Sequence, residues 1–375
     1  MRRETDMPPL FHGKMLMVDL SDGTLEEREV DDDIYARRIG GAPLISVLTK
    51  KDGISLGCGP LTGLPCPGAS MAAACVDKDR KHRFAPVMLN AGQEIKLSGF
   101  DAIVVEGRSE KPVYLWIRDQ VADLVSAEKL AGKDAWESIS SIRHEQGDQR
   151  IQVISSSEGP SASLNFVSGW DGMGFGGAMR DMNLRAIAVR GMGEVPVENP
   201  EQVLARCSEM MKSSGKLIAG RGGIGSMAPH EIAGKIRTSG RNRACFSCPY
   251  PCMSFIETGY TAYPGMLLMD QKSVIHLAKN SAKDGDILTD LVELHRGGRC
   301  TWESPANVTY ETMTDGVGEY DLIAAGYVLG ICPRYLGLIQ PSLQAYCELL
   351  SIALGTQISK EAVLSLGNCL MKEVC

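Results

Sequence analysis

The chain has 375 residues and a formal net charge of −7, with 44% hydrophobic and 23% charged residues. This composition is typical of a soluble globular protein; it excludes collagen, a long coiled coil and global disorder, and the acidic balance disfavours nucleic acid as the main partner. No apolar run reaches the roughly 18 residues needed to span a bilayer, and residues 1–6 lack the apolar stretch of a secretory signal, so we expect a cytoplasmic protein with no membrane span.

The first half of the chain predicts a β-rich region. Residues 14–20 alternate apolar and polar side chains, and after a short turn the chain returns as a second strand over 25–30. Three consecutive aspartates then predict the start of a helix that ends at Gly40 and Gly41. The remaining elements expected in this half are strands at 71–76, 102–106, 113–117, 151–154 and 184–189, and a helix at 134–145.

The second half predicts helices, and Pro200 and Pro341 stand where helices commonly begin. Strands and helices do not alternate regularly, so a doubly wound sheet is not expected. We predict an α+β fold in which a β-rich domain over 1–198 is followed by a helical region over 199–375. The helices of this region are expected at 200–213, 266–279, 287–295, 343–354 and 359–372.

Four of the 12 cysteines form a candidate metal centre. Cys245, Cys248 and Cys252 follow a C-x2-C-x3-C spacing in a proline-containing loop, and Cys332, between a glycine-ended helix and a proline, is the proposed fourth ligand. Four thiolates hold either a [4Fe–4S] cluster or a structural zinc ion. We favour the cluster because structural zinc usually takes paired C-x2-C knuckles. Buried structural cysteines remain the third interpretation.

The other cysteines lack ligand spacing and are interpreted as small hydrophobic residues. Three glycine-rich segments, at 57–63, 169–177 and 220–225, allow close backbone approach. Each is open to two interpretations: a cradle for an anionic cofactor, or turns and tight backbone packing. None has the Gly-Lys-Ser/Thr sequence of a P-loop.

Taken in chain order, these features resemble the tungsten-pterin aldehyde:ferredoxin oxidoreductase family. The resemblance includes the opening strand, a Gly-Pro-Leu-Thr-Gly segment, a Glu-Ile-Lys-Leu-Ser-Gly-Phe-Asp segment, the three-cysteine loop and a Leu-Gly-x-Cys segment. The residues that carry it are 13–20, 39–41, 59–63, 94–107, 111–115, 183–191, 245–252 and 329–332.

The resemblance implies a base of two β-sheets beneath the pterins, covered by helical domains. It implies a [4Fe–4S] cluster held by Cys245, Cys248, Cys252 and Cys332 beside a tungsten–bis-pterin centre. It further implies oxidation of aldehydes to acids, with ferredoxin as the electron acceptor. For the pterins, Asn90, Gly92, Gly174 and Gly176 are the predicted backbone or amide contacts, and no catalytic residue is assigned.

Several family features are altered in this sequence. The stretch 67–71 lacks the arginine that links cluster and pterin in the family, and 375 residues is short for a member. Two functions are therefore weighed. The first is a divergent, shortened oxidoreductase acting on an aldehyde or oxo group; the second is a pterin-free iron–sulfur subunit that transfers electrons within a larger redox complex. The expected partner is ferredoxin or another redox subunit, and an oligomer is an open alternative.

Overall fold

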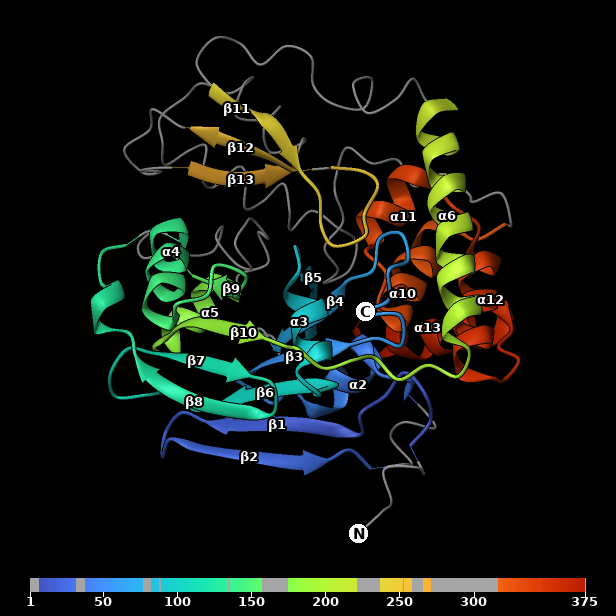
Figure 1. Ribbon diagram of the computed structural model, residues 1–375. Helices are drawn as coiled ribbons and strands as arrows, with labels where there is room; N and C mark the ends of the chain where they lie inside the picture. The colour runs from blue at the N-terminus through green and yellow to red at the C-terminus, as the bar shows by residue number, and fades with distance from the viewer. Residues whose placement is uncertain are drawn as a thin grey trace.

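The computed structural model places two β-sheets beside a group of helices, with a third, smaller sheet above them (Figure 1). It describes residues 7–31, 38–76, 82–87, 89–133, 135–156, 175–220, 237–251, 253–257, 266–270 and 316–374.

The larger sheet has six strands in the order β2-β1-β6-β3-β4-β5. Neighbouring strands are antiparallel except β1 and β6, which are parallel, so the sheet is mixed. The strands are β1 (Lys14–Asp19), β2 (Thr24–Glu29), β3 (Ile54–Cys58), β4 (Met71–Val76), β5 (His82–Val87) and β6 (Ala102–Glu106).

The second sheet has four strands in the order β8-β7-β10-β9. Its central pair, β7 and β10, is parallel, and each edge strand is antiparallel to its neighbour. The strands are β7 (Val113–Arg118), β8 (Val121–Ser126), β9 (Gln152–Ser155) and β10 (Leu184–Arg190), and a 3-10 turn at Glu128–Leu130 follows β8.

Side chains that alternate along the strands build layers on both faces of the large sheet. On β4, Met71 and Ala73 join the core shared with the four-stranded sheet, whereas Ala72 and Ala74 join the core shared with the helices. Because both faces are covered, β4 reads as a nearly continuous apolar run instead of an alternating one. The helices that pack on these layers are α2 (Gly41–Leu48), α3 (Ala91–Leu97) and α5 (Phe175–Asp181). Helix α4 (Ala135–Gln146) packs instead on the outer face of the four-stranded sheet, beside β9.

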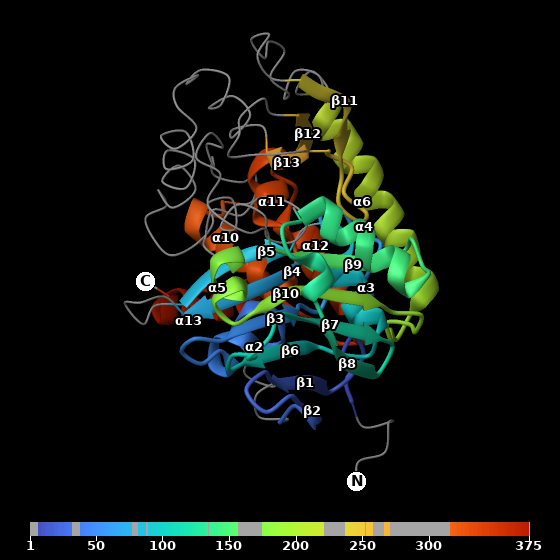
Figure 2. The same ribbon diagram turned by 90° about the vertical axis from the view of Figure 1, so that its left-hand side faces the viewer.

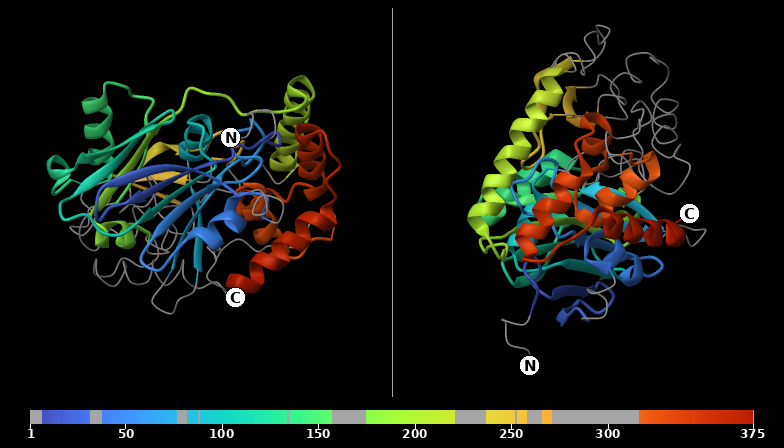
Figure 3. Two further views of the ribbon diagram at one scale, coloured as in Figure 1. Left: turned by 90° about the horizontal axis from the view of Figure 1, so that it is seen from below. Right: turned by 90° about the vertical axis from the view of Figure 1, so that its right-hand side faces the viewer.

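The later helices gather on one side of the large sheet, where α6 runs alongside α11 and α12 (Figures 2 and 3). They are α6 (Pro200–Gly220), α10 (Glu319–Leu329), α11 (Pro333–Ile339), α12 (Leu343–Leu354) and α13 (Lys360–Val374). None of the helices in the described ranges has both the length and the hydropathy needed to cross a membrane.

The α+β prediction is confirmed, with one correction in the second half. A third, antiparallel sheet lies there, in the order β11-β12-β13. Its strands are β11 (Arg237–Arg243), β12 (Met253–Glu257) and β13 (Met266–Asp270). The helix expected at 266–279 is therefore wrong over its first five residues, because a short apolar run suits either element and pairing with β12 decides it. Residues 271–279 and 287–295 lie outside the described residues.

A second difference concerns the first helix. The expected helix ends at Gly40 and Gly41, but α2 begins at Gly41; residues 32–37 lie outside the described ranges. Both glycines have positive φ, 85° and 59°, so the chain changes direction there before the apolar helix starts.

Candidate metal centre

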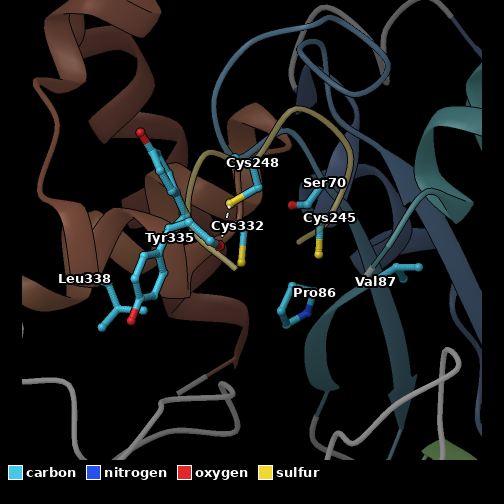
Figure 4. A pocket seen from close by; sticks show the side chains of 10 residues that line it. Ser70, Pro86, Val87, Cys245, Cys248, Cys332, Tyr335 and Leu338 are labelled. Carbon is cyan, nitrogen blue, oxygen red and sulfur yellow. Dashed lines mark hydrogen bonds between the residues drawn. The ribbon is translucent and has the colours of Figure 1, made fainter. Parts of the chain in front are cut away.

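Three of the four predicted ligand thiols line one cavity. Cys245 and Cys248 come from the loop between β11 and β12, and Cys332 comes from the start of α11. Figure 4 shows their sulfur atoms around a common space, with Tyr335 on one side and Pro86 on the other. The full lining is Gly68, Ser70, Pro86, Val87, Cys245, Cys248, Tyr250, Cys332, Tyr335 and Leu338. Cys252 lies outside the described residues.

The chain around Cys332 is fixed by backbone geometry. Helix α10 ends at Gly330, which adopts the left-handed conformation, and Cys332 is the N-cap of α11 with Pro333 at its first turn. The Cys332 N–H donates to the Gly68 carbonyl at 2.8 Å, and Ala69 forms an isolated β-bridge with Ile331. The thiol is therefore anchored to a loop of the large sheet as well as to its own helix.

Cys245 and Cys248 are held by a tight turn. The Cys248 N–H donates to the Cys245 carbonyl at 3.1 Å, and Ser247 between them has a φ of 50°. The Leu89 N–H donates to the Cys245 sulfur at 3.1 Å. The Cys248 thiol donates to the Tyr250 carbonyl at 3.3 Å, a hydrogen bond that the sulfur must give up before it can bind a metal as a thiolate.

Two buried tyrosines lie at the cavity: Tyr335 lines it, and Tyr346 lies outside the lining. The hydroxyls of Tyr335 and Ser214 are 2.6 Å apart, which ties α11 to α6. The Tyr346 hydroxyl donates to the Pro67 carbonyl at 2.8 Å, which ties α12 to the loop before β4. Burial raises the pKa of both phenols above the usual range, so they stay neutral and act through hydrogen bonds.

The chemistry of the lining fits an iron–sulfur cluster. The cavity presents soft thiol donors among apolar and tyrosine side chains, and its described lining includes no carboxylate or imidazole. Within the described ranges, no three histidine, cysteine or carboxylate side chains come close enough to share one metal ion. A cluster makes a different demand, since each thiolate binds a separate iron and the four thiolates surround a larger body.

The other cysteines in the described part of the chain are not among the residues that line this cavity. Burial raises the pKa of the Cys58 thiol to about 12 and of the Cys207 thiol to about 11, so both are protonated core residues. Cys369 is exposed, which differs from the expected buried role. Cys300 and Cys375 lie outside the described residues.

The predicted pterin contacts are only partly described. Asn90 precedes α3 as its N-cap residue, Gly92 lies within α3, and Gly176 is buried in α5; Gly174 lies outside the described residues. A Cβ on Gly92 would lie 2.7 Å from the Cβ of Met71, so packing against β4 already requires a glycine at this position.

The first glycine-rich segment packs against the end of α10. A Cβ on Gly59 would lie 2.4 Å from the Gly330 nitrogen, and the Leu61 N–H donates to the Leu329 carbonyl at 3.0 Å. Gly59 therefore packs directly against the backbone of Gly330, which leaves no room for a side chain. The segments at 169–177 and 220–225 lie mostly outside the described residues.

Comparison with known proteins agrees with this architecture. Residues 15–191 match the family described as the aldehyde ferredoxin oxidoreductase N-terminal domain. The chain is 26% identical over 293 residues to a tungsten-containing aldehyde ferredoxin oxidoreductase of Pyrococcus furiosus, covering 64% of this chain and 48% of that protein. A counterpart from Thermococcus kodakarensis is 27% identical over 293 residues.

Residues 15–191 thus resemble the N-terminal domain of the aldehyde ferredoxin oxidoreductase family, and the similarity to the tungsten-containing relatives extends over 293 residues. The match spans about half the length of these relatives. The aliphatic sulfonate oxidoreductase, WOR-like subunit, of Pyrococcus furiosus is 22% identical over 223 residues. In fold, the chain is similar to the active site complex BamBC of benzoyl coenzyme A reductase, with a TM-score of 0.72 at 14% identity, over 98% of this chain and 88% of that one.

Sequence reasoning did not identify Leu89 and Tyr335 as parts of this site. Leucine is not a metal ligand, tyrosine is not a usual ligand of iron–sulfur clusters, and neither residue belongs to a recognised motif with Cys245 or Cys332. The available signal was indirect: Leu89 immediately precedes Asn90, and Tyr335 lies three residues after Cys332, one helical turn along α11.

Proposed function

We propose that this chain is an oxidoreductase that holds a [4Fe–4S] cluster on Cys245, Cys248, Cys252 and Cys332. The observation that carries the proposal is the shared cavity. Cys245 and Cys248 line it together with Cys332, about 85 residues later in the chain, next to the β-rich region that matches the aldehyde ferredoxin oxidoreductase N-terminal domain. We also propose the division of the chain at 198/199, just before α6 begins at Pro200.

We further propose a tungstopterin contacted by Asn90, Gly92, Gly174 and Gly176. The names of the relatives support tungsten. When bound, this group supplies two-electron oxo chemistry, and the net reaction converts an aldehyde and water into a carboxylic acid, two protons and two electrons. The chain holds the cofactors and excludes water around the cluster; ferredoxin, or a similar iron–sulfur protein, accepts the electrons one at a time.

The second candidate is a pterin-free iron–sulfur subunit that transfers electrons inside a larger redox complex. Two comparisons favour it: one relative is named as a subunit, and the similar fold belongs to a complex. At Gly92, moreover, packing against Met71 is sufficient reason for a glycine.

Metal analysis of protein purified without oxygen separates the two. About four irons per chain with about one tungsten or molybdenum supports the enzyme. Iron alone supports the electron-transfer subunit. Zinc alone contradicts both.

A further inference from the structure

The backbone N–H and carbonyl of Leu89 both form hydrogen bonds with the start of the cysteine loop, at Cys245 and Phe246. Its N–H donates to the Cys245 sulfur at 3.1 Å, and its carbonyl accepts the N–H of Phe246 at 3.2 Å. Leu89 lies between β5 and α3, far from this loop in sequence. The contact therefore joins the β-domain directly to the candidate metal centre.

The backbone of Leu89 adopts an unfavourable left-handed conformation, which directs its N–H toward Cys245. Its φ is 62°, in the left-handed region that residues other than glycine rarely adopt. Its side chain packs at the margin of the core between the two large sheets. Packing on one side and two hydrogen bonds on the other thus hold the N–H toward the sulfur.

The hydrogen bond to Cys245 suits a thiolate. An N–H donor stabilises negative charge on a sulfur, and hydrogen bonds to the sulfurs are one of the ways in which proteins set cluster potentials. One-electron reduction of a cluster adds one negative charge and breaks no bond. A donor fixed on a ligand sulfur therefore stabilises the reduced form more than the oxidised form.

We infer that Leu89 is a positioning residue that raises the reduction potential of the cluster through its N–H bond to Cys245. The inference rests on the proposed cluster and adds to it a group that sets its electron affinity. Because Leu89 directly precedes Asn90, one short backbone segment would contact the cluster ligand and a predicted pterin contact.

The test replaces the Leu89 amide with an ester, by incorporating the α-hydroxy acid analogue of leucine. This change removes the N–H and keeps the side chain. The matched control is the same replacement at Phe246, which removes the other hydrogen bond of the contact but leaves the sulfur its donor. Iron content and the midpoint potential of a dithionite titration are measured for both.

The expected result is full iron content in both proteins and a more negative midpoint potential in the Leu89 ester alone. Equal shifts in both proteins, or an iron-loaded Leu89 ester with an unchanged potential, would overturn the inference while leaving the proposed function in place. Absence of iron from the unmodified protein would overturn both.

Two ordinary variants guard against misfolding of the ester protein. Leu89→Asn keeps the N–H and tolerates the left-handed backbone, so its potential should match the unmodified protein. Leu89→Val disfavours that backbone and should shift the potential in the same direction as the ester. A shift in Leu89→Asn with none in Leu89→Val contradicts the inference.

Discussion

At the scale of single residues, the cavity thiols are distinguished by their contacts. Cys245 accepts a hydrogen bond from Leu89, whereas Cys248 donates one to Tyr250. The Cys248 thiol must lose its proton and its hydrogen bond to Tyr250 before it can bind a metal, so its contacts alone resemble those of a structural cysteine. Substitution is therefore the direct test of its role.

Cys248→Ala should abolish or strongly reduce bound iron, because a cluster that loses one thiolate ligand is poorly held. Cys369→Ala is the matched control, since Cys369 is exposed on α13 and should leave iron unchanged. Iron content and visible absorbance are measured on protein purified without oxygen. Full absorbance in Cys248→Ala would remove this residue from the ligand set.

The buried ion pair of Lys96 and Asp101 is a structural centre of the β-domain. Both side chains are fully buried, and the Asp101 carboxylate also accepts the backbone N–H groups of His12 and Gly13 at 2.8 Å. Lys96→Met leaves that carboxylate buried without its cation and should lower the free energy of unfolding by about 3–5 kcal/mol. Urea denaturation measures the loss; Lys50→Met, at an exposed ion pair with Glu106, should cost less than about 1 kcal/mol. Equal losses would contradict this account.

His12 should make stability depend on pH. Burial first, and then the Lys96 charge, lower the pKa of His12 below 6.5, and its Nε2 is buried without a hydrogen bond within the described part of the chain. The unfolded state then binds more protons, so stability is complete above about pH 6.5 and falls as the pH drops toward the folded-state pKa. His12→Gln should flatten this decline in pH-dependent urea titrations. Substitution of the exposed His144 is the control, and an unchanged slope in His12→Gln would refute the assignment.

At the scale of elements, Gly330 links α10 to the turn that carries Cys332. It has a φ of 76°, and a Cβ there would lie 2.5 Å from the Thr62 hydroxyl oxygen and 3.0 Å from the Gly59 Cα. The end of the helix thus touches the backbone of the β-domain. This contact gives the first glycine-rich segment a packing role.

Gly330→Ala should destabilise the fold by about 2–4 kcal/mol, because left-handed strain is added to a clash with the Thr62 hydroxyl and a tight approach to the Gly59 backbone. Gly355→Ala tests strain without that clash: φ is 66°, and the nearest atom is the flexible Glu198 Cγ at 3.0 Å. Its cost should be about 1–2 kcal/mol. Thermal unfolding compares the two, and an equal cost would show that the approach to Gly59 is unimportant.

At the scale of the whole molecule, the sheets and the later helices meet at the loop before β4. The contacts there include the Gly59–Gly330 approach, the Ala69–Ile331 bridge and the Tyr346–Pro67 hydrogen bond. All of them lie beside the cavity. The candidate metal centre therefore lies at the interface between the sheets and the later helices.

Tyr346→Phe should loosen this joint. It removes the donor to a buried carbonyl and should cost about 1–3 kcal/mol. Amide exchange should speed up at Ser70 and Cys332, whose N–H groups bond to Gly330 and Gly68 across the joint. Tyr114→Phe, which loses a hydrogen bond to Gln146 in the outer layer, should leave those two amides unchanged. Faster exchange in both variants would point to global unfolding instead.

The sequence alone predicted seven strands of the two larger sheets and helices α4, α6, α12 and α13, but not β3, β5, β8 or the third sheet. The choice of cysteines as ligands stays a prediction. Apolar periodicity is a local property, and C-x2-C-x3-C is visible as spacing, so neither needs the fold to be recognised. It misassigned 266–270, because a short apolar run acquires its identity only when β12 pairs with it.

The tertiary structure places Cys332, proposed from the sequence as a fourth ligand, in the same cavity lining as Cys245 and Cys248. Only the tertiary structure revealed that Leu89 and Tyr335 contact this centre. The tertiary structure also shows why residue 59 is a glycine: a Cβ there would clash with the backbone of Gly330. These relations join residues far apart in the chain, through backbone groups that every residue type carries. Such contacts leave no pattern in the amino-acid sequence, because they form only when the sheets and helices pack together.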